Sequence, residues 1–203
     1  MQERKVLIAT TNAGKFDEFL TQLGTLNCKF VSLNDVDIGD DEPDEPFETT
    51  WQNAMHKARY YGLKTGLVTF AEDTAFCVEY LNGAPGVLAK RFGATPLERN
   101  HKILKALNGA SESARKAYFQ TAGCVFFPEN NNFYIFNGRV DGLISESISK
   151  ASRPGMGYDS IFYFPPLKSC FAELTIEQKN SVSHRGQIIK QLKNFLQRMY
   201  LYA

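Results

Sequence analysis

The feature that most constrains the fold is an apolar run near the N-terminus that passes through a short polar turn into a helical pattern. The run from Lys5 to Ala9 is apolar and β-branched after its first residue, and the turn TTNAGK follows. Four apolar residues then recur at helical spacing: Phe16, Phe19, Leu20 and Leu23. A strand that leads straight into a helix buries one face of each element against the other. This segment therefore predicts a protein in which helices cover a sheet.

The same order of elements recurs along the chain. Thr49 or Thr50 is placed to cap a second helix, which leads into the apolar run GLVTF. The sequence TPLE at residues 95–98 predicts a third helix with a capping box and proline at its first position. A last helix is expected after Ser183. The expected buried stripes are Trp51, Ala54, Met55, Ala58 and Tyr61 in the second helix, Leu97, Ile103, Leu104 and Leu107 in the third, and Ile188, Ile189, Leu192, Phe195, Leu196 and Met199 in the last.

Two β-rich stretches, about residues 117–127 and 133–145, flank the turn PENNN and predict an antiparallel hairpin. Helices interleaved with strands, together with such a hairpin, indicate an α/β fold with a mixed sheet. Neither an internal repeat nor an interdomain linker interrupts the 203 residues, so we expect a single domain over residues 1–203. Residues 35–48 carry eight acidic side chains in fourteen positions with two prolines, which predicts an exposed loop.

Composition and charge narrow the expected partners and location. A formal net charge of +1 and a pI near 7.6 provide no overall attraction for nucleic acid, so none is expected as a partner. No run approaches the ~20 apolar residues that would span a bilayer, and the N-terminal apolar stretch is too short for a signal peptide. We therefore expect a cytoplasmic protein that does not bind membranes. The four cysteines lie far apart without a CxxC pair, which predicts buried reduced thiols.

The first turn is a candidate phosphate site. A strand that feeds a polar turn and then a helix directs free backbone N–H groups and the positive end of the helix dipole toward the space above the turn. Thr10, Thr11 and Asn12 add short hydrogen-bonding side chains, and Lys15 adds a mobile positive charge. The alternative is that Thr11 or Asn12 only caps the helix and that Lys15 is a solvated surface residue.

Glu72 and Asp73 are candidate metal ligands. They follow the apolar run GLVTF, which reads as a buried strand, and ligands gather at the carboxyl ends of strands in parallel-type sheets. Adjacent carboxylates repel each other unless a cation lies between them. Mg²⁺ suits this place because it prefers one or two protein carboxylates and fills its other positions with water and phosphate. The alternative is a helix cap or a solvated loop.

The segment EQKNSVSHRG, from Glu177 to Gly186, is the third polar cluster. It gathers Lys179, His184 and Arg185 with two serines at the start of the last predicted helix, outside that helix's apolar stripe. Cations at a helix N-terminus oppose the helix dipole, so an anionic or carbonyl-rich ligand would account for them. A surface capping segment is the alternative. His56 and His101 lie on predicted helices and are interpreted as structural.

Together these segments resemble the inosine and xanthosine triphosphate pyrophosphatase family over about residues 5–197. The resemblance rests on four motifs in order: ATTNAGKFDE, AEDTAFCVEYLNGAPGVLAKRF, GMGYDSIF and FAELTIEQKNSVSHRGQ. Members of that family cleave deaminated purine nucleoside triphosphates to the monophosphate and pyrophosphate. The resemblance implies this reaction for ITP, dITP and XTP, with Mg²⁺ as cofactor and Mn²⁺ as a substitute. It also implies an elongated mixed sheet flanked by helices, two lobes with the active-site cleft between them, and a homodimer.

The resemblance also assigns roles to individual residues. Asp73 matches the family's metal-binding and proton-accepting aspartate, and Glu45 matches its other metal carboxylate, with Glu72 assisting. The family's phosphate-binding residues fall on Thr10, Thr11, Asn12, Lys15 and Lys179. Residues around the purine base fall on Thr74, Met156, Gly157, Tyr158, Asp159, His184 and Arg185. In this arrangement Arg185 or a backbone N–H favours the acceptor oxygen that hypoxanthine and xanthine carry where adenine has an amino group.

Three positions depart from the family pattern, and two other functions compete with the expected one. Met156 replaces an aromatic residue, Gln52 stands where Glu is usual, and Glu72 replaces the commoner Asp. Met156 makes the same chemistry with a different or broader base preference one alternative. The other is a catalytically silent nucleotide-binding protein. The complete set of Glu45, Asp73, Lys15 and Lys179 favours an enzyme over such a protein.

Overall fold

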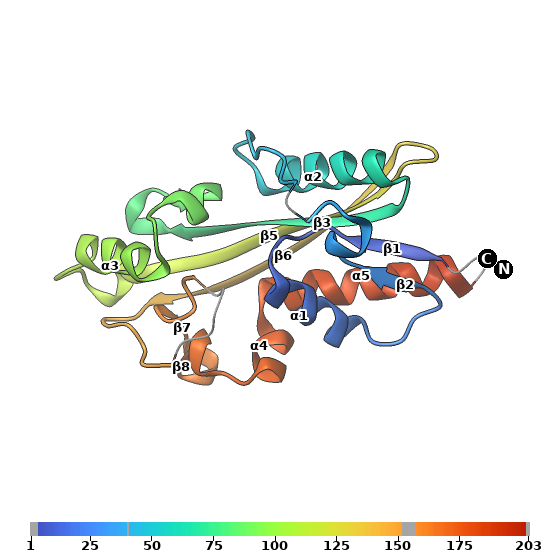
Figure 1. The fold of residues 1–203 in the computed structure, drawn as a ribbon. Helices are drawn as coiled ribbons and strands as arrows, with labels where there is room; N and C mark the ends of the chain where they lie inside the picture. The colour runs from blue at the N-terminus through green and yellow to red at the C-terminus, as the bar shows by residue number, and fades with distance from the viewer. Residues whose placement is uncertain (1–3, 40, 152–156, 202–203) are drawn as a thin grey trace. The chain divides into compact units, whose positions relative to one another are not determined.

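The computed structural model describes residues 4–39, 41–151 and 157–201, and its mixed sheet confirms the predicted α/β fold (Figure 1). In these described ranges, eight strands form the sheet in the order β2-β1-β3-β5-β6-β7-β8, and β4 pairs with β3. Strand β1 pairs in parallel with β2 and β3, whereas the pairs β3–β4, β6–β7 and β7–β8 are antiparallel.

The strands are β1 (Lys5–Ile8), β2 (Lys29–Val31), β3 (Val68–Val78), β4 (Pro85–Gly86), β5 (Lys116–Phe127), β6 (Asn132–Ile144), β7 (Phe162–Phe164) and β8 (Ser169–Cys170). The α-helices are α1 (Ala13–Leu23), α2 (Thr50–Thr65), α3 (Pro96–Ala106), α4 (Ile176–Val182) and α5 (His184–Leu201). The short 3-10 helices are η1 (Asn34–Val36), η2 (Glu79–Leu81), η3 (Val87–Arg91), η4 (Glu112–Arg115), η5 (Pro165–Leu167) and η6 (Phe171–Glu173).

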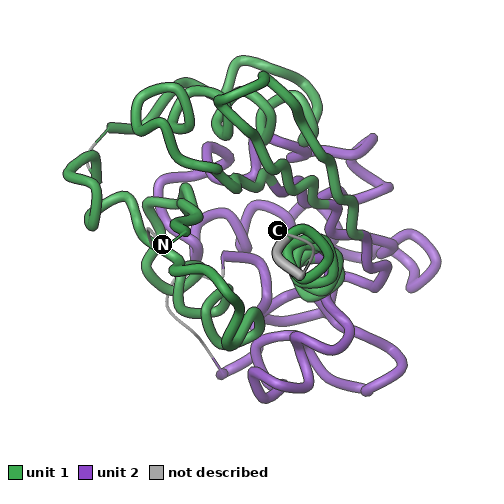
Figure 2. The backbone as a smooth tube through the Cα atoms, turned by 90° about the vertical axis from the view of Figure 1, so that its right-hand side faces the viewer, with its two compact units in different colours: residues 1–73, 121–138, 185–203 green, residues 74–120, 139–184 purple. Residues whose placement is uncertain are grey.

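The chain forms two compact units, which Figure 2 shows in different colours. Unit 1 comprises residues 1–73, 121–138 and 185–203, and unit 2 comprises residues 74–120 and 139–184. Each unit is therefore built from segments that are discontinuous in the sequence. Strands β3, β5 and β6 contribute residues to both units.

Unit 1 has an apolar core on each face of its strands. Leu7 of β1 belongs to one core and its neighbours Val6 and Ile8 belong to the other, as expected for a pleated strand. The first core includes the α2 residues Ala54, Ala58 and Tyr61, and the second includes Phe19 and Leu23 of α1 and Ile188, Ile189, Leu192 and Leu196 of α5. Helix α2 thus covers one face of these strands, and α1 and α5 cover the other (Figure 1).

The described residues of unit 2 form an apolar core that is rich in aromatic side chains. The ring centroid of Phe119 lies 4.6 Å from that of Phe76 and 4.8 Å from that of Phe162, and Phe171 packs against Phe162 at 4.7 Å. Ile103 brings α3 into the same cluster. Phenylalanines from several strands and from η6 therefore hold this unit together.

The predicted helix starts are confirmed, but two predicted core residues are wrong. Thr49 caps α2 by accepting from Gln52 N, and Thr95 caps α3 by accepting from Glu98 N, with proline at the first helical position. The predicted buried stripes include Trp51 and Leu97, which are 45% and 57% exposed in the structure. Each is the second residue of its helix, and its side chain faces solvent at that position.

The predicted hairpin is also present. Strands β5 and β6 are hydrogen-bonded neighbours that are joined by residues 128–131.

All four cysteines are free, and three of them are buried as predicted, whereas Cys28 is half-buried. Within the described ranges, no helix is both long and apolar enough to cross a membrane.

Candidate active site

The two adjacent carboxylates lie inside strand β3, which corrects the prediction that they follow its end. The sequence places the end of the strand near Phe70, whereas β3 continues to Val78. Successive side chains of a strand point to opposite faces. Phe70 packs in the core that contains α1 and α5, and Ala71 packs in the core beneath α2. Glu72 therefore shares the face of α1 and α5, and Asp73 shares the face of α2.

The register of β1 against β3 brings the first turn beside these carboxylates. Ile8, the last residue of β1, pairs with Phe70, and Ala9 N donates a 2.7 Å hydrogen bond to Phe70 O. Because β1 stops there while β3 continues, the turn at residues 10–12 emerges next to Glu72. The carboxyl end of a strand with parallel neighbours is where ligands bind in α/β sheets.

The turn itself is organised by its own side chains. Thr10 Oγ1 accepts a 3.2 Å hydrogen bond from Asn12 N, and Asn12 Oδ1 accepts one of 3.1 Å from Lys15 N. Asn12 is thus the N-cap of α1, as the structural alternative predicted, and Thr11 is exposed. The cap does not compete with phosphate binding, because the dipole of α1 still favours an anion at this end.

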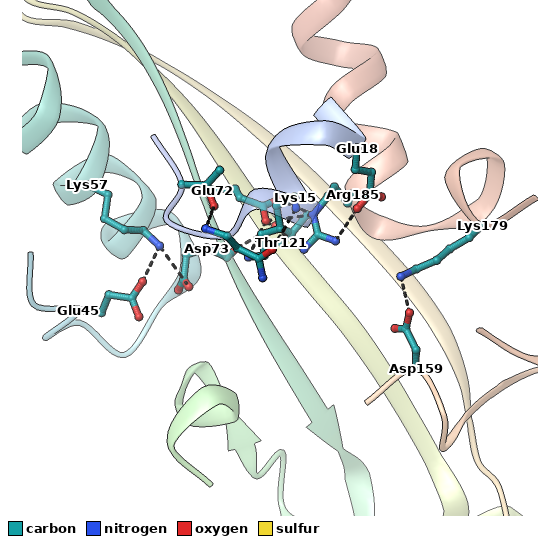
Figure 3. Close-up of polar contacts among 12 residues, drawn as sticks. Lys15, Glu18, Glu45, Lys57, Glu72, Asp73, Thr121, Asp159, Lys179 and Arg185 are labelled. Atoms are coloured by element: carbon teal, nitrogen blue, oxygen red, sulfur yellow. Dashed lines mark hydrogen bonds and ion pairs between the residues drawn. The ribbon is translucent and has the colours of Figure 1, made fainter. Parts of the chain in front are cut away.

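Glu72 lies in a buried network of opposite charges (Figure 3). Arg185 Nε lies 3.0 Å from each of its carboxylate oxygens, and Lys15 Nζ lies 2.8 Å from Oε1. Arg185 Nη1 reaches Glu18 Oε2 at 3.2 Å. Burial lowers the pKa of Lys15, and the charge of Glu72 opposes this effect. Two cations already compensate Glu72, so the geometry argues against its expected part in a metal site.

Asp73 has a different set of partners on the α2 face. Asn53 Nδ2 donates a 3.1 Å hydrogen bond to Asp73 Oδ2, and Lys57 Nζ lies 3.8 Å from Oδ1. The same lysine forms an ion pair with Glu45 (Figure 3). Asn53 also exchanges two 3.0 Å hydrogen bonds with the backbone of Phe47, which fixes the acidic loop that carries Glu45 against α2. The structure therefore brings Glu45 and Asp73 to one position, beside the ammonium of Lys57.

Glu45 and Asp73 are the two residues at this position that could hold a magnesium ion. Burial raises the pKa of Asp73; the charge of Lys57 opposes that shift and the charge of Glu45 adds to it. Among residues 4–39, 41–151 and 157–201, no group of three or more His, Cys, Asp or Glu side chains is arranged to hold a metal ion. Two carboxylates are nevertheless what Mg²⁺ takes from a protein when phosphate and water supply its other ligands. The ammonium of Lys57 marks the place where positive charge is favoured.

The other predicted residues lie in unit 2, where several are buried. The ring of Tyr158 stacks on Phe76 with centroids 4.4 Å apart, and its hydroxyl donates a 2.7 Å hydrogen bond to Ala89 O. Burial raises the pKa of Tyr158 to about 12. Asp159 forms a buried ion pair with Lys179, which Figure 3 shows. The ring of His184 stacks on that of Phe119 at 4.6 Å.

The predicted site residues thus fall into two sets. Unit 1 holds Thr10, Thr11, Asn12, Lys15, Glu45, Glu72, Asp73 and Arg185, and unit 2 holds Thr74, Gly157, Tyr158, Asp159, Lys179 and His184. Lys179, predicted to bind phosphate, pairs with a residue of the base segment, and Arg185, predicted to contact the base, pairs with Glu72. Met156 lies outside the described residues. The expected cleft stays a prediction.

Comparison with known proteins identifies the family. Residues 6–195 match the sequence model described as the Ham1 family. This chain belongs to the Ham1 family.

Similar Ham1 proteins are known from several bacteria. The dITP/XTP pyrophosphatase of Thermoanaerobacter pseudethanolicus is 36% identical over 195 residues, which cover 95% of this chain and 96% of the relative. That of Nitrosomonas europaea is 38% identical over 200 residues, which cover 95% and 94%. The solved structure of a HAM1 protein from Coxiella burnetii has a TM-score of 0.87 at 34% identity and covers 96% of this chain and 99% of its own.

Three polar residues of this Ham1 protein were missed by sequence reasoning: Glu18, Asn53 and Lys57. Asn53 and Lys57 are four residues apart, so they share one face of α2, and this spacing beside the apolar stripe could have indicated them. Glu18 precedes the buried Phe19 in α1 and is itself buried, but its partner Arg185 lies 167 residues away in the sequence. Nothing in the local pattern of α1 indicates that contact.

Proposed function

We propose that this Ham1 protein hydrolyses deaminated purine nucleoside triphosphates (ITP, dITP and XTP) to the nucleoside monophosphate and pyrophosphate. The observation that carries the proposal is the convergence of Glu45 and Asp73 on one cationic position in unit 1. In the same unit, the turn after β1 presents the start of α1 and Lys15. Relatives similar over nearly their whole length are named dITP/XTP pyrophosphatases, which supports this substrate class.

We propose Mg²⁺ as the cofactor, with Mn²⁺ as a substitute, held by Glu45 and Asp73. When bound, such an ion withdraws charge from the triphosphate and orients it. The side chains supply the rest of the chemistry. Asp73 accepts the proton of a water molecule whose oxygen bonds to the α-phosphorus, while the bond from that phosphorus to the bridging oxygen breaks and pyrophosphate leaves. Burial raises the pKa of Asp73, which makes it a stronger base, and Asn53 orients it.

Positive groups stabilise the leaving pyrophosphate in this proposal. Lys15 is partly exposed, with 28% of its side chain accessible, and Glu72 holds its ammonium at 2.8 Å. Because burial disfavours the charged form of Lys15, an additional anion beside it is favourable. The N-terminus of α1 contributes its dipole at the same place. We assign Lys179 to this task through the resemblance of its motif.

Base selectivity is assigned to Gly157, Tyr158, Asp159, His184 and Arg185 through the same resemblance. A hydrogen-bond donor that faces position 6 of the purine pairs with the oxygen of hypoxanthine or xanthine. With adenine the donor stays unpaired, which costs about 1–3 kcal/mol. Arg185 stays one candidate for this donor, although its guanidinium also binds Glu72 and Glu18.

A substrate panel tests the function. We expect pyrophosphate release from dITP, ITP and XTP with Mg²⁺, much slower release from ATP and GTP, and loss of activity when a chelator removes the metal. Adding Mg²⁺ or Mn²⁺ back should restore it. Nucleotide binding without pyrophosphate release from any member of the panel would favour the catalytically silent alternative. Equal rates for all purines would favour the broader base preference.

We also propose that the protein works as a homodimer in the cytoplasm, where nucleoside triphosphates are available as substrates. The dimer is what the family resemblance of the sequence motifs implies. Light scattering on the purified protein should give twice the 22.9 kDa of the chain. A mass of one chain at micromolar concentration would contradict the dimer.

A further inference from the structure

One arginine outside every predicted motif connects three segments of unit 2. Arg99 lies on α3, and its Nη1 donates hydrogen bonds to Lys90 O at 3.0 Å and Gly93 O at 3.1 Å. These carbonyls lie at the end of η3 and just beyond it. One nitrogen of the guanidinium thus ties this stretch of backbone to α3 and leaves Nη2 to face another segment.

The same guanidinium packs against the segment assigned to the base. A Cβ built on Gly157 would lie 3.1 Å from Arg99 Nη2, and the guanidinium carbon lies 5.9 Å from the ring centroid of Tyr158. The second distance is within the range of cation–π attraction. The guanidinium of Arg99 therefore packs closely against the backbone at Gly157, where a larger residue would have to displace it by a few tenths of an ångström.

Two further hydrogen bonds hold this segment against the same surroundings. Asn100, the residue after Arg99, donates from Nδ2 to Ser160 Oγ at 2.8 Å. Tyr158 donates to Ala89 O at 2.7 Å. Residues 157–160 are therefore anchored by α3 on one side and by residues 89–93 on another, and Arg99 contacts both.

We propose that Arg99 is a positioning residue that fixes Gly157 and Tyr158 and thereby sets the preference for purines with an oxygen at position 6. Arg99 acts through the segment it holds. Small displacements of that segment change the fit of the base more than they change the reaction at the phosphate, which is assigned to residues of unit 1 together with Lys179. This inference rests on the proposed function, because it takes the base to be bound by residues 157–159.

Kinetics of Arg99→Met provide the first test, with Lys102→Met as the matched control. Lys102 lies on the same helix and donates to the neighbouring Phe92 O at 3.0 Å. The control thus removes a positive charge from the same helix and a hydrogen bond to the same loop as Arg99→Met does. For Arg99→Met we expect the KM for dITP to rise about tenfold, the order of one lost charge-assisted hydrogen bond, with kcat nearly unchanged. The ratio of kcat/KM for dITP to that for ATP should fall in Arg99→Met. In Arg99→Lys this ratio should lie between those of Arg99→Met and the wild type. An unchanged KM and an unchanged ratio would overturn the inference, as would an equal effect of Lys102→Met.

The contact with Gly157 allows a second test. Gly157→Ala places a Cβ 3.1 Å from Arg99 Nη2 and displaces the guanidinium slightly, so it should lower selectivity in the same direction as Arg99→Met but by less. Because both changes act on one contact, the double variant should be no less selective than Arg99→Met alone. A multiplicative loss would show that the two residues act independently and would overturn the inference.

Hydrogen exchange separates this inference from the proposed function. Without nucleotide, amides of the peptide that contains Tyr158 should exchange faster in Arg99→Met than in the wild type, and Lys102→Met should match the wild type. If the wild type releases no pyrophosphate, the proposed function fails, while the exchange data still decide whether Arg99 holds the segment. If the wild type is active and exchange in Arg99→Met is unchanged, this inference alone fails.

Discussion

Replacing Glu72 by glutamine would decide whether this carboxylate stabilises the fold or binds the metal. Glu72 is 4% exposed, and Arg185 and Lys15 hold its oxygens at 3.0 Å and 2.8 Å. Glutamine keeps the shape and removes the charge. Arg185 then retains Glu18 as its charged partner in this network, and Lys15 loses the carboxylate that compensates its burial.

The expected cost follows from burial. Removing one partner of a buried ion pair lowers the free energy of unfolding by about 3–5 kcal/mol. Lys15 is partly exposed and can turn toward water, and Arg185 keeps Glu18 at 3.2 Å, so we expect the lower end, about 3 kcal/mol. This is a large part of the ~5–15 kcal/mol by which domains are normally stable.

Urea denaturation measures this cost. The midpoint should fall for Glu72→Gln while the m-value stays constant, because the native state remains compact. Asp141→Asn is the matched control, since it removes the charge of a carboxylate that is 67% exposed and 2.7 Å from Arg139 Nη2. An exposed pair contributes at most about 1 kcal/mol. Any remaining pyrophosphatase activity of Glu72→Gln should need the same Mg²⁺ concentration as the wild type.

Two results would refute this reasoning. If Glu72→Gln loses no more stability than Asp141→Asn, the buried network contributes nothing measurable. If stability is unchanged while the Mg²⁺ requirement rises about tenfold, Glu72 is a metal ligand after all and the two faces of β3 are assigned wrongly.

Asp73→Asn should abolish pyrophosphate release while circular dichroism shows an intact fold, and full activity in this variant would exclude Asp73 as the base. Burial raises the pKa of Asp73 above 3.8, so the folded protein holds this proton more tightly than the unfolded chain does. The stabilisation that this protonation gives is complete below pH 3.8 and is lost as pH rises through the folded-state pKa of Asp73. The free energy of unfolding of the metal-free wild type should therefore fall with rising pH in this range, and Asp73→Asn should remove that fall. Equal slopes of unfolding free energy against pH in the two proteins would contradict the raised pKa of Asp73. Lys57→Met should increase the rise in Tm that Mg²⁺ produces without nucleotide, because the ammonium and the ion compete for Glu45 and Asp73; an unchanged rise would contradict this competition. Gly123→Ala places a Cβ 2.7 Å from two ring atoms of Phe70 and should lower the free energy of unfolding by about 1–3 kcal/mol, and a stability equal to that of the wild type in urea would contradict this close packing.

The order of elements and most helix starts could be predicted from the sequence because their causes are local. Apolar residues at helical spacing, the caps Asn12, Thr49 and Thr95, and the turn between β5 and β6 act within a few residues of one another. The family motifs are local in the same sense. They led to Glu45 and Asp73 as partners, and the structure brings both to Lys57.

The length of β3 and the contacts of its two carboxylates were decided only by the tertiary structure. Charged residues usually end an apolar strand, but Glu72 stays inside β3 because Arg185, 113 residues away in the sequence, compensates its charge. Alternation along β3 then directs Asp73 to Asn53 and Lys57 on α2. Arg99 likewise gains its importance from carbonyl groups and a glycine that the fold brings to it. Local patterns determine which elements form, whereas the compensation of buried charge depends on segments that meet only after folding.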